Sequence, residues 1–422
     1  METNNPYEVD IDFAVLALQD ADFAKILKSN GQLDFSNPES VQQLTKSLLK
    51  RDFGLTIELP PDRLCPPVPN RINYVLWVQN LLDSTSDSYS DRYDPGREVI
   101  GLDIGTGASC IYPLLGCAQR PKWRFAGTDI DDKSLQFAKK NVVGNHLQDR
   151  IKLLQTQSDS PLLPLDIMVD ISSIDFSMCN PPFYESTAEM LASAKAKQRP
   201  AFTACTGSET EMVTEGGEVA FVSKIIDESL ILCHRVQWYT SMLGKFSSVA
   251  TVIEKLRAHN IGNYAATEFI QGNKTRRWGI AWSFEDMRPK SSVARGLHSL
   301  PKSLLPFPSE YVIQLTNANG EEIGRHVNET LSLFPLKWMW KPTISTGVGF
   351  TDKAVWSRAV RRHSSKDQDM DEENIALGFK IHVGRGDTVD VVKVVIRWLR
   401  GHETVLFESF CGMVKRKLEE TK

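Results

Sequence analysis

The sequence predicts an α/β fold with a parallel sheet, preceded by a helical N-terminal extension and followed by a smaller C-terminal α+β domain. Between residues 98 and 287, short apolar runs alternate with segments of helical periodicity. Repeating strand–helix units imply a parallel sheet with helices on both faces. We therefore divide the chain into an extension (1–97), a central α/β domain (98–287), a Pro-, Ser- and Lys-rich linker (288–307) and a C-terminal domain (308–422).

The N-terminal extension has three predicted helices and one extended segment. Apolar spacing predicts helix from Phe13 to Leu27, from Pro38 to Leu49 and from Asn70 to Leu82. The prolines between Leu59 and Pro69 exclude helix there, because proline lacks an N–H group and restricts the preceding residue. Asp83–Arg97, rich in Ser and Asp, is typical of a surface loop.

The central domain contains five predicted strands in series and a closing hairpin. The strands are Glu98–Asp103, Trp123–Thr128, Ile151–Leu154, Ile174–Cys179 and Val236–Leu243, and the antiparallel edge hairpin is Thr267–Ile270 with Arg277–Phe284. The helices are Asp132–Gly144 with Asp131 as a possible cap, amphipathic Glu218–Cys233, and Ser248–His259 with Ser248 as its cap. In the C-terminal domain, strands are predicted at Tyr311–Thr316, Ala376–Val383 and Val389–Trp398, and a helix at Glu403–Lys417.

Composition excludes several classes of protein. Hydrophobic residues make up 41% and charged residues 24% of the 422, as in ordinary globular proteins. The net charge of -4 gives no global signature of nucleic-acid binding, so any such contact must come from local patches. The seven scattered cysteines lack a CxxC pair and the histidines lack metal-ligand spacing, which predicts neither disulfides nor a metal site. We expect no secretory signal and no membrane span.

The end of the first central strand carries a candidate cofactor loop. Gly105 and Gly107 allow close approach of the backbone to a nucleoside, but no third glycine follows three residues later, as a dinucleotide site requires. S-adenosylmethionine carries no phosphate and needs no such glycine. Asp103 can order the loop and face the cationic amino-acid end of this cofactor. Asp129, at the end of the second strand, can accept hydrogen bonds from ribose hydroxyls, although a helix-capping role is the plainer alternative.

The segment after the fourth strand predicts a methyl-acceptor site. The residues Asn180, Pro181, Pro182 and Phe183 follow the strand directly, and the two prolines fix the backbone. The Asn180 amide oxygen and the Pro181 carbonyl can then accept both N–H bonds of an exocyclic amine, such as N6 of adenine, while Phe183 stacks on the base. A turn that merely ends a strand is the alternative. The position of the motif in a series that already has the glycine loop favours amino-methyl transfer.

Longer motifs resemble one family closely. These are Arg51–Leu55, Asp103–Gly116, Met178–Phe183, Glu215–Glu218, Met242–Lys245 and Arg277–Phe284. Over residues 10–287 the chain resembles the U6 small nuclear RNA adenosine N6-methyltransferases, with more distant bacterial relatives that act on ribosomal RNA. The resemblance implies a Rossmann-like class I methyltransferase sheet and S-adenosylmethionine as methyl donor. It implies cofactor contacts at Arg71, Gly105, Asp129 and Asn180. It also implies a structured RNA substrate, a nuclear location and an RNA-binding C-terminal domain.

Three groups of cations are candidate RNA contacts, each weighed against simple solvation of a charged surface. They are Lys46, Lys50 and Arg51 in the extension, Lys195, Lys197 and Arg199 after the acceptor motif, and Lys274, Arg276 and Arg277 in the hairpin. Further candidates in the C-terminal domain are Arg361, Arg362, Lys415, Arg416 and Lys417.

Other functions remain open on the residues alone. A protein-glutamine methyltransferase also places Asn-Pro-Pro before an aromatic residue, and a ribosomal RNA adenosine would fit the same site. A catalytically silent RNA-binding regulator is a further alternative, which the intact acceptor motif disfavours. A nicotinamide-dependent oxidoreductase is disfavoured by the missing third glycine.

Overall fold

The computed structural model describes residues 5–168, 172–196, 207–271, 275–297, 299–357, 374–386, 388 and 390–420, which form two compact units. The first unit comprises residues 1–83, 92–284 and 297–304, and the second comprises residues 84–91, 285–296 and 305–422. None of the helices in the described ranges is both long and apolar enough to cross a membrane.

A mostly parallel sheet organises the first unit. Its strands are β1 (Val99–Ile104), β2 (Trp123–Asp129), β3 (Ile151–Gln155), β4 (Ile174–Cys179), β5 (Val236–Leu243), β6 (Tyr264–Gln271) and β7 (Thr275–Trp282), in the spatial order β3-β2-β1-β4-β5-β7-β6. The strands β1 to β5 pair in parallel, and the antiparallel β6–β7 hairpin joins β5 through β7. The predicted parallel sheet with a closing hairpin is therefore confirmed.

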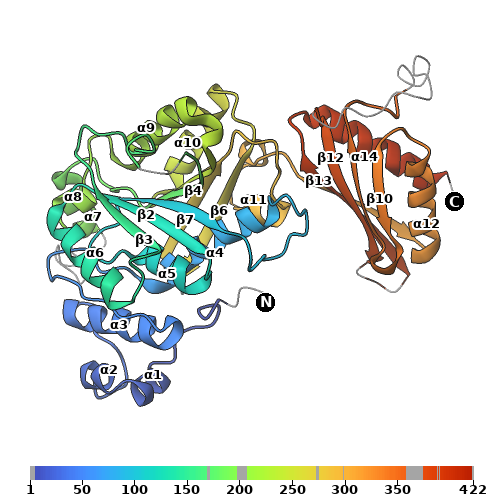
Figure 1. The fold of residues 1–422 in the computed structure, drawn as a ribbon. Coiled ribbons are helices and arrows are strands. Elements are labelled where there is room, and N and C mark those ends of the chain that lie inside the picture. The colour runs from blue at the N-terminus through green and yellow to red at the C-terminus, as the bar shows by residue number, and fades with distance from the viewer. Residues whose placement is uncertain are drawn as a thin grey trace. The chain divides into compact units, whose positions relative to one another are not determined.

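Helices cover both faces of this sheet. Helices α9 (Gly217–Leu232) and α10 (Phe246–Ala258) lie on one face, and α4 (Val68–Ser84), α5 (Ile111–Gln119) and α6 (Asp132–Gly144) lie on the other (Figure 1). The remaining helices of this unit are α1 (Phe13–Gln19), α2 (Ala21–Ile26), α3 (Pro38–Phe53), α7 (Thr187–Ala196) and α8 (Glu209–Met212). Phe176, Trp238 and Trp282 are fully buried in the core. A Cβ atom at Gly101 would lie 2.3 Å from the Phe176 ring, so only glycine fits there.

The sheet brings the predicted site residues together at the carboxyl ends of its strands. Ile104 at the end of β1 pairs with Thr128 on β2 and with Cys179 on β4. The glycine loop, Asp129 and Asn180 each follow one of these three parallel strands. Ligands of open α/β sheets bind outside the carboxyl ends of the strands.

Two local predictions were wrong. The predicted helix from Phe13 to Leu27 is broken at Asp20, which is extended (φ -133°) and accepts hydrogen bonds from the N–H groups of Asp22 and Phe23 as the cap of α2. A helix cap that interrupts a continuous apolar pattern is easily mistaken for helix interior. Ser248 does not cap α10, because the helix begins two residues earlier at Phe246 and Ser248 is buried inside it. Asp131, in contrast, caps α6 as predicted.

The second unit is an antiparallel sheet covered by helices. Its strands lie in the order β10 (Lys337–Lys341), β11 (Thr346–Thr351), β12 (Leu377–Arg385), β13 (Val391–Arg400) and β9 (Glu310–Thr316). Helices α12 (Gly320–Ser332) and α14 (Thr404–Glu419) pack on one face, with Phe379, Ile396 and Phe410 in the shared core. Residues 288–307, predicted as a linker, contain α11 (Ser291–Ala294), β8 (Arg295–Gly296) and a short 3-10 helix (Lys302–Leu304).

The loop of residues 84–91 belongs to the second unit, although it precedes β1 in sequence. Asp91 forms ion pairs with Lys380 (2.7 Å) and with Arg397, whose side chain is only 5% exposed. Tyr89 packs on Phe350 with the ring centroids 5.3 Å apart. This loop therefore supplies the only carboxylate that the described ion pairs place against these two cations.

We predict that Asp91→Ala destabilises the second unit by about 3 kcal/mol, because removal of one partner leaves buried cations uncompensated. Hydrogen exchange of the full chain, followed at β12 and β13, measures this loss directly. The exposed neighbour Asp87→Ala is the control. Unchanged protection in Asp91→Ala would show that the loop merely rests on the sheet.

Candidate cofactor and acceptor site

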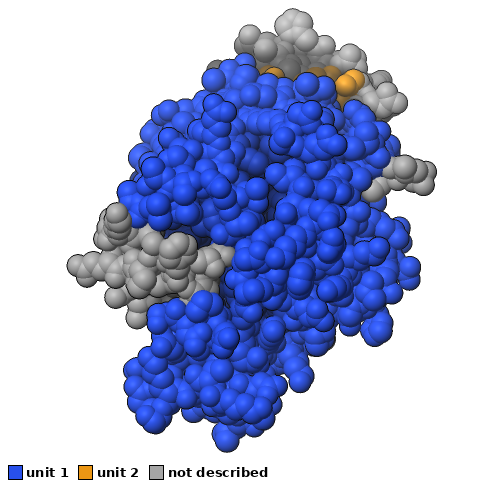
Figure 2. All heavy atoms as spheres, turned by 90° about the vertical axis from the view of Figure 1, so that its left-hand side faces the viewer, with its two compact units in different colours: residues 1–83, 92–284, 297–304 blue, residues 84–91, 285–296, 305–422 orange. Residues whose placement is uncertain are grey.

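A cavity of about 310 Å³ opens at the carboxyl ends of β1, β2 and β4. Figure 2 turns toward the viewer the side of the first unit on which α6, α7 and α8 lie in Figure 1, and the surface there is hollowed. The volume is in the range of small-molecule sites. Of the predicted site residues, those that line the cavity are Arg71, Gly105, Gly107, Asp129, Asn180 and Pro182.

The glycine loop depends on left-handed backbone conformations. Gly105 and Gly107 have φ values of 71° and 64°, which residues other than glycine rarely adopt. The Thr106 N–H donates to the Thr128 carbonyl at 2.8 Å, and the Gly107 N–H donates to Asp129 Oδ2 at 2.8 Å. The loop is thereby tied to the end of β2.

Asp129 and Asp131 have different roles, one at the glycine loop and one at the start of α6. Asp131 caps α6 by accepting from the N–H of Ser134, whereas Asp129 points to the glycine loop and lines the cavity. The capping alternative for Asp129 is therefore excluded. Burial raises the pKa of Asp129, and the hydrogen bonds from Asp131 and Gly107 oppose this rise. Its oxygens retain lone pairs that can accept further donors from a ligand.

Arg71 is a buried cation in the cavity wall. Its side chain extends from α4, and the residue is 5% exposed. It donates to the Tyr112 hydroxyl at 2.8 Å and approaches Met242 Sδ at 3.4 Å, so residues of α5 and β5 hold it. Within the described residues, Arg71 Nε has no hydrogen-bond partner. A buried guanidinium of this kind suits the carboxylate of a ligand.

Asp103 lies on β1 and is fully buried beneath the glycine loop. It does not line the cavity, so the predicted direct contact with a cofactor stays a prediction. Burial raises the pKa of Asp103 to about 7, with Asp129 adding to the rise and Arg71 opposing it. Its charge state therefore changes near neutral pH.

The acceptor motif lies directly after β4. Asn180 Oδ1 is buried and accepts no hydrogen bond from the described part of the chain. Pro181 is buried, and Pro182 lines the cavity. Backbone hydrogen bonds between Tyr184 and the segment Met212–Thr214 (3.1 and 3.0 Å) hold the chain that follows the motif. The motif thus holds a rigid, unsatisfied acceptor within the cavity wall.

Phe183 is held by contacts that the sequence motifs did not reveal. Gly244 lies against its ring, because a Cβ atom at Gly244 would be 2.6 Å from Phe183 Cδ1. Glu218, 2% exposed, fixes this turn by accepting from the N–H groups of Gly244 (2.6 Å) and Lys245 (2.9 Å). The Arg277 guanidinium lies 5.4 Å from the centroid of the Phe183 ring.

Sequence reasoning missed part of the cavity wall. Leu64 and Pro66 of the extension contribute to it, as do Glu211 and the segment 156–162 after β3. For this last segment, the family resemblance implies a loop at residues 155–160 that touches the cofactor pocket, although it implies no individual contacts. Glu228 of α9 anchors it by accepting from the N–H groups of Leu162 and Leu163. The Ser208-x-x-Glu211 pattern is typical of a capping box, so the sequence could have predicted that Glu211 lies in the first turn of a helix.

The predicted RNA contacts lie in several places. Arg277 is close to the acceptor motif, and burial and the nearby Arg71 lower its pKa. Arg276 pairs with Glu268 at 2.8 Å, and Arg51 pairs with Asp52 at 2.6 Å. Lys46 and Lys50 lie on α3, and Lys195 lies on α7. Lys197, Arg199, Lys274, Arg361 and Arg362 lie outside the described residues.

Comparison with known proteins decides the family. A family described as RNA methyltransferase matches residues 1–286. This chain belongs to that family. It is 38% identical over 395 residues to the U6 small nuclear RNA (adenine-(43)-N(6))-methyltransferase of Schizosaccharomyces pombe, covering 93% of this chain and 97% of the relative. It is 44% identical to the human RNA N(6)-adenosine-methyltransferase METTL16, covering 65% of this chain and 49% of the relative.

Solved structures agree with this assignment. The human Mettl16 catalytic domain in complex with MAT2A 3'UTR hairpin 1 matches with a TM-score of 0.59 and 41% identity, over 68% of this chain and 96% of that one. The N-terminal domain of human METTL16 in complex with SAH matches with a TM-score of 0.55 and 40% identity, over 68% and 99%. The family resemblance and the Rossmann-like methyltransferase fold predicted from the sequence are confirmed.

We predict that Asp103 makes the stability of the ligand-free protein depend on pH. The folded pKa is above the ordinary value of 3.8, so the folded state binds more protons in this window and its stability falls as pH rises from about 4 through 7. The free energy of unfolding of Asp103→Asn, relative to that of wild type, should increase by on the order of 2–3 kcal/mol between pH 5 and pH 8. Urea unfolding at both pH values tests this, with exposed Asp149→Asn as control; a constant difference refutes it.

We predict that Gly244→Ala displaces the Phe183 ring. The added methyl group would lie 2.6 Å from the ring, so the ring or the turn must move. Methyl transfer should fall by about tenfold to a hundredfold, the cost of misplacing a positioning group by about 1 Å. Gly144→Ala is the matched control, because nothing lies within 4 Å of its added Cβ. Equal kcat in both variants would contradict a positioning role.

Proposed function

We propose that this protein transfers a methyl group from S-adenosylmethionine to N6 of an unpaired or flipped adenosine in U6 small nuclear RNA. The observation that carries the proposal is the buried, unsatisfied Asn180 Oδ1 in the Asn-Pro-Pro-Phe motif, at the cavity wall. A buried acceptor without a donor costs about 1–3 kcal/mol. An exocyclic amine of a base supplies the missing donor.

The cavity fits S-adenosylmethionine. Its charged lining residues are Arg71, Asp129 and Glu211. One guanidinium and two carboxylates complement a ligand that has one carboxylate, two cationic centres and a ribose. Arg71 would hold the carboxylate, and Asp129 would hold the ribose hydroxyls. When bound, this molecule supplies an electrophilic methyl group on a sulfonium centre.

The acceptor residues orient the amine rather than activate it by proton abstraction. Asn180 Oδ1 and the Pro181 carbonyl would each accept one N–H bond, which leaves the nitrogen lone pair directed at the methyl group. Phe183, fixed by Gly244 and Glu218, would hold the plane of the base. The nitrogen would form its bond to the methyl carbon by in-line displacement while the carbon–sulfur bond breaks and the neutral thioether leaves, and the surplus proton on nitrogen would then pass to water. Positioning of this kind can remove a large part of the free-energy barrier to displacement.

The relatives support the choice of RNA. The S. pombe protein, whose name specifies U6 small nuclear RNA, aligns with nearly the whole of this chain, including the second unit. Two solved human domains are complexes with MAT2A 3'UTR hairpins, so a structured hairpin is the second candidate substrate. Membership of an RNA methyltransferase family disfavours a peptide amide as acceptor. A nuclear location follows from the proposed substrate.

The second unit would contribute RNA contacts of its own. Lys415, Arg416 and Lys417 lie on α14, where Lys415 and Lys417 are near Glu419 and Glu420. These exposed ion pairs contribute little to stability, so the cations can exchange their partners for phosphate. The three groups of predicted RNA-binding cations in the first unit retain that role in the proposal.

We expect wild type to transfer labelled methyl to transcribed U6 small nuclear RNA, with N6-methyladenosine identified by nucleoside mass spectrometry. Asn180→Ala should lower kcat by about 10²–10³, the usual cost of removing one preorganised polar group. Gln136→Ala removes an exposed amide on α6 and is the control. Cofactor binding without transfer to U6 RNA would refute the substrate, and transfer to MAT2A hairpins alone would favour the second candidate.

A further inference from the structure

A short segment of the N-terminal extension crosses the cofactor cavity. We call residues 60–66, with the sequence Pro-Pro-Asp-Arg-Leu-Cys-Pro, the strap. Leu64 and Pro66 line the cavity, and the Arg63 N–H donates to the Pro60 carbonyl in a turn. Prolines at both ends restrict the backbone, so the strap loses little conformational entropy when it is held in place.

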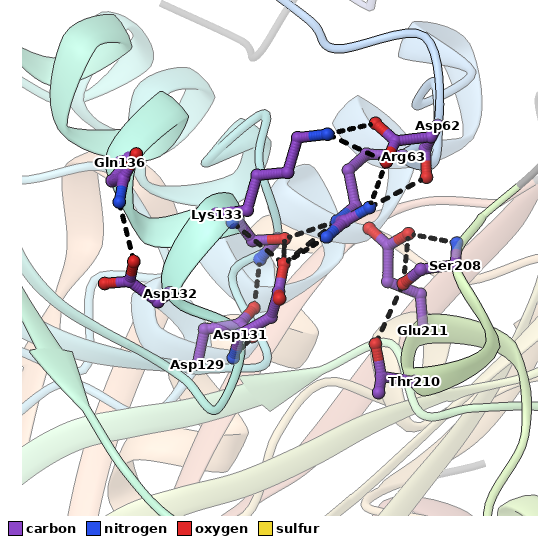
Figure 3. Close-up of polar contacts among 12 residues, drawn as sticks. Asp62, Arg63, Asp129, Asp131, Asp132, Lys133, Gln136, Ser208, Thr210 and Glu211 are labelled. Atoms are coloured by element: carbon purple, nitrogen blue, oxygen red, sulfur yellow. Dashed lines mark hydrogen bonds and ion pairs between the residues drawn. The ribbon is translucent and has the colours of Figure 1, made fainter.

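One side of the strap is fixed to the end of β2 (Figure 3). The Arg63 side chain is 11% exposed, and its Nε and Nη2 both lie 2.9 Å from Asp131 Oδ2. The N–H of Asp131 in turn donates to Asp129 Oδ1 at 2.9 Å. Arg63 therefore holds the residue that orients the proposed ribose-binding carboxylate. Asp62 adds an exposed ion pair with Lys133 at 2.8 Å.

The other side of the strap is fixed to the segment beside the acceptor motif (Figure 3). The Leu64 N–H donates to Glu211 Oε2 at 3.1 Å. The Ser208 N–H donates to the same oxygen at 2.7 Å, as Figure 3 shows. Glu211 Oε1 lies toward the glycine loop, 3.7 Å from where a Cβ atom on Gly107 would be. Glu211 thus has one oxygen bound to the protein and lies in the wall of the cavity.

The bonds at the two sides have a common consequence. Met212 and Thr214, next to Glu211, pair with Tyr184 immediately after the acceptor motif. The strap therefore connects the β2 side of the cavity, through Arg63 and Asp131, with the acceptor side, through Leu64 and Glu211. Of the two lining carboxylates, Glu211 is bonded to the strap directly, and Asp129 is linked to it through Asp131.

We propose that the strap retains S-adenosylmethionine, with Arg63 as a positioning residue for Asp129 and with Glu211 as a contact for the cationic amino-acid end of this molecule. The inference rests on the proposed function, because it takes the cavity as the S-adenosylmethionine site. A cationic end favours a nearby carboxylate, and among the lining residues Glu211 is the carboxylate left for it, because Asp129 is assigned to the ribose and Asp103 does not line the cavity.

Binding to the full-length chain, measured by calorimetry with S-adenosylmethionine and S-adenosylhomocysteine, tests the strap without RNA. Arg63→Ala should weaken binding of both roughly tenfold, since it removes a charge-assisted contact. KM for S-adenosylmethionine should rise in parallel, while kcat at saturation changes less than about threefold. Arg63→Lys should recover part of the affinity, because lysine keeps the charge but loses the planar fork.

Glu211→Gln tests the other side while keeping an acceptor for Leu64 and Ser208. It should weaken S-adenosylmethionine binding roughly tenfold with little change in Tm, because only the charge is removed. Arg124→Ala is the control. Arg124 lies on β2, as Asp129 does, and the substitution breaks an exposed ion pair with Glu98, so this variant should bind S-adenosylmethionine as wild type does. If Arg63→Ala does not fold, Glu211→Gln alone decides the proposal.

The outcomes separate the two levels of inference. Unchanged affinity in Glu211→Gln, or a lower Tm with unchanged affinity in Arg63→Ala, would overturn the strap while leaving the proposed function intact. Equal falls in kcat and affinity in Arg63→Ala would show a merely structural role and also overturn it. A wild-type protein that binds neither probe would overturn the proposed function itself.

Discussion

The burial of Arg71 is the constraint on which much of the site depends. The guanidinium is taken out of water at the meeting point of α4, α5 and β5, where Tyr112 and Met242 hold it. Its positive charge interacts with the Asp103 carboxyl group, but burial raises the pKa of Asp103 to about 7, so this carboxyl group offsets the cation only in part near neutral pH. A buried cation with so little compensation is costly. The cavity is therefore more stable with a ligand carboxylate beside Arg71 than without one.

This constraint also explains why the N-terminal extension cannot be a separate appendage. Arg71 comes from α4, and the strap precedes α4 directly. Tyr74 of the same helix donates to or accepts from Thr240 on β5 at 2.6 Å and accepts from the Cys179 N–H at the end of β4. The extension thus supplies the strap in the cavity wall, the buried cation Arg71, and Tyr74, which bonds to β5 and to the end of β4. It is therefore part of the catalytic unit.

Local physical chemistry was sufficient for much of the fold. Strand and helix periodicity predicted β4, β5 and α6 to the residue, and the parallel order then required that Gly105, Asp129 and Asn180 meet at one edge. The proline pattern predicted that the strap is not helical, but it predicted neither the turn at residues 61–63 nor the partners of the strap. The Leu64–Glu211 bond joins residues 147 positions apart, and no periodicity encodes such a pair. The pairing of loop 84–91 with β12 and β13 escaped prediction for the same reason.

The electrostatics of the acceptor side give the substrate a further part in stabilising the site. Arg277 lies over the Phe183 ring, and its pKa is lowered by burial and then by the positive charge of Arg71. Two like charges at one site raise the free energy of the ligand-free protein. A carboxylate near Arg71 and an RNA phosphate near Arg277 would each offset part of this repulsion.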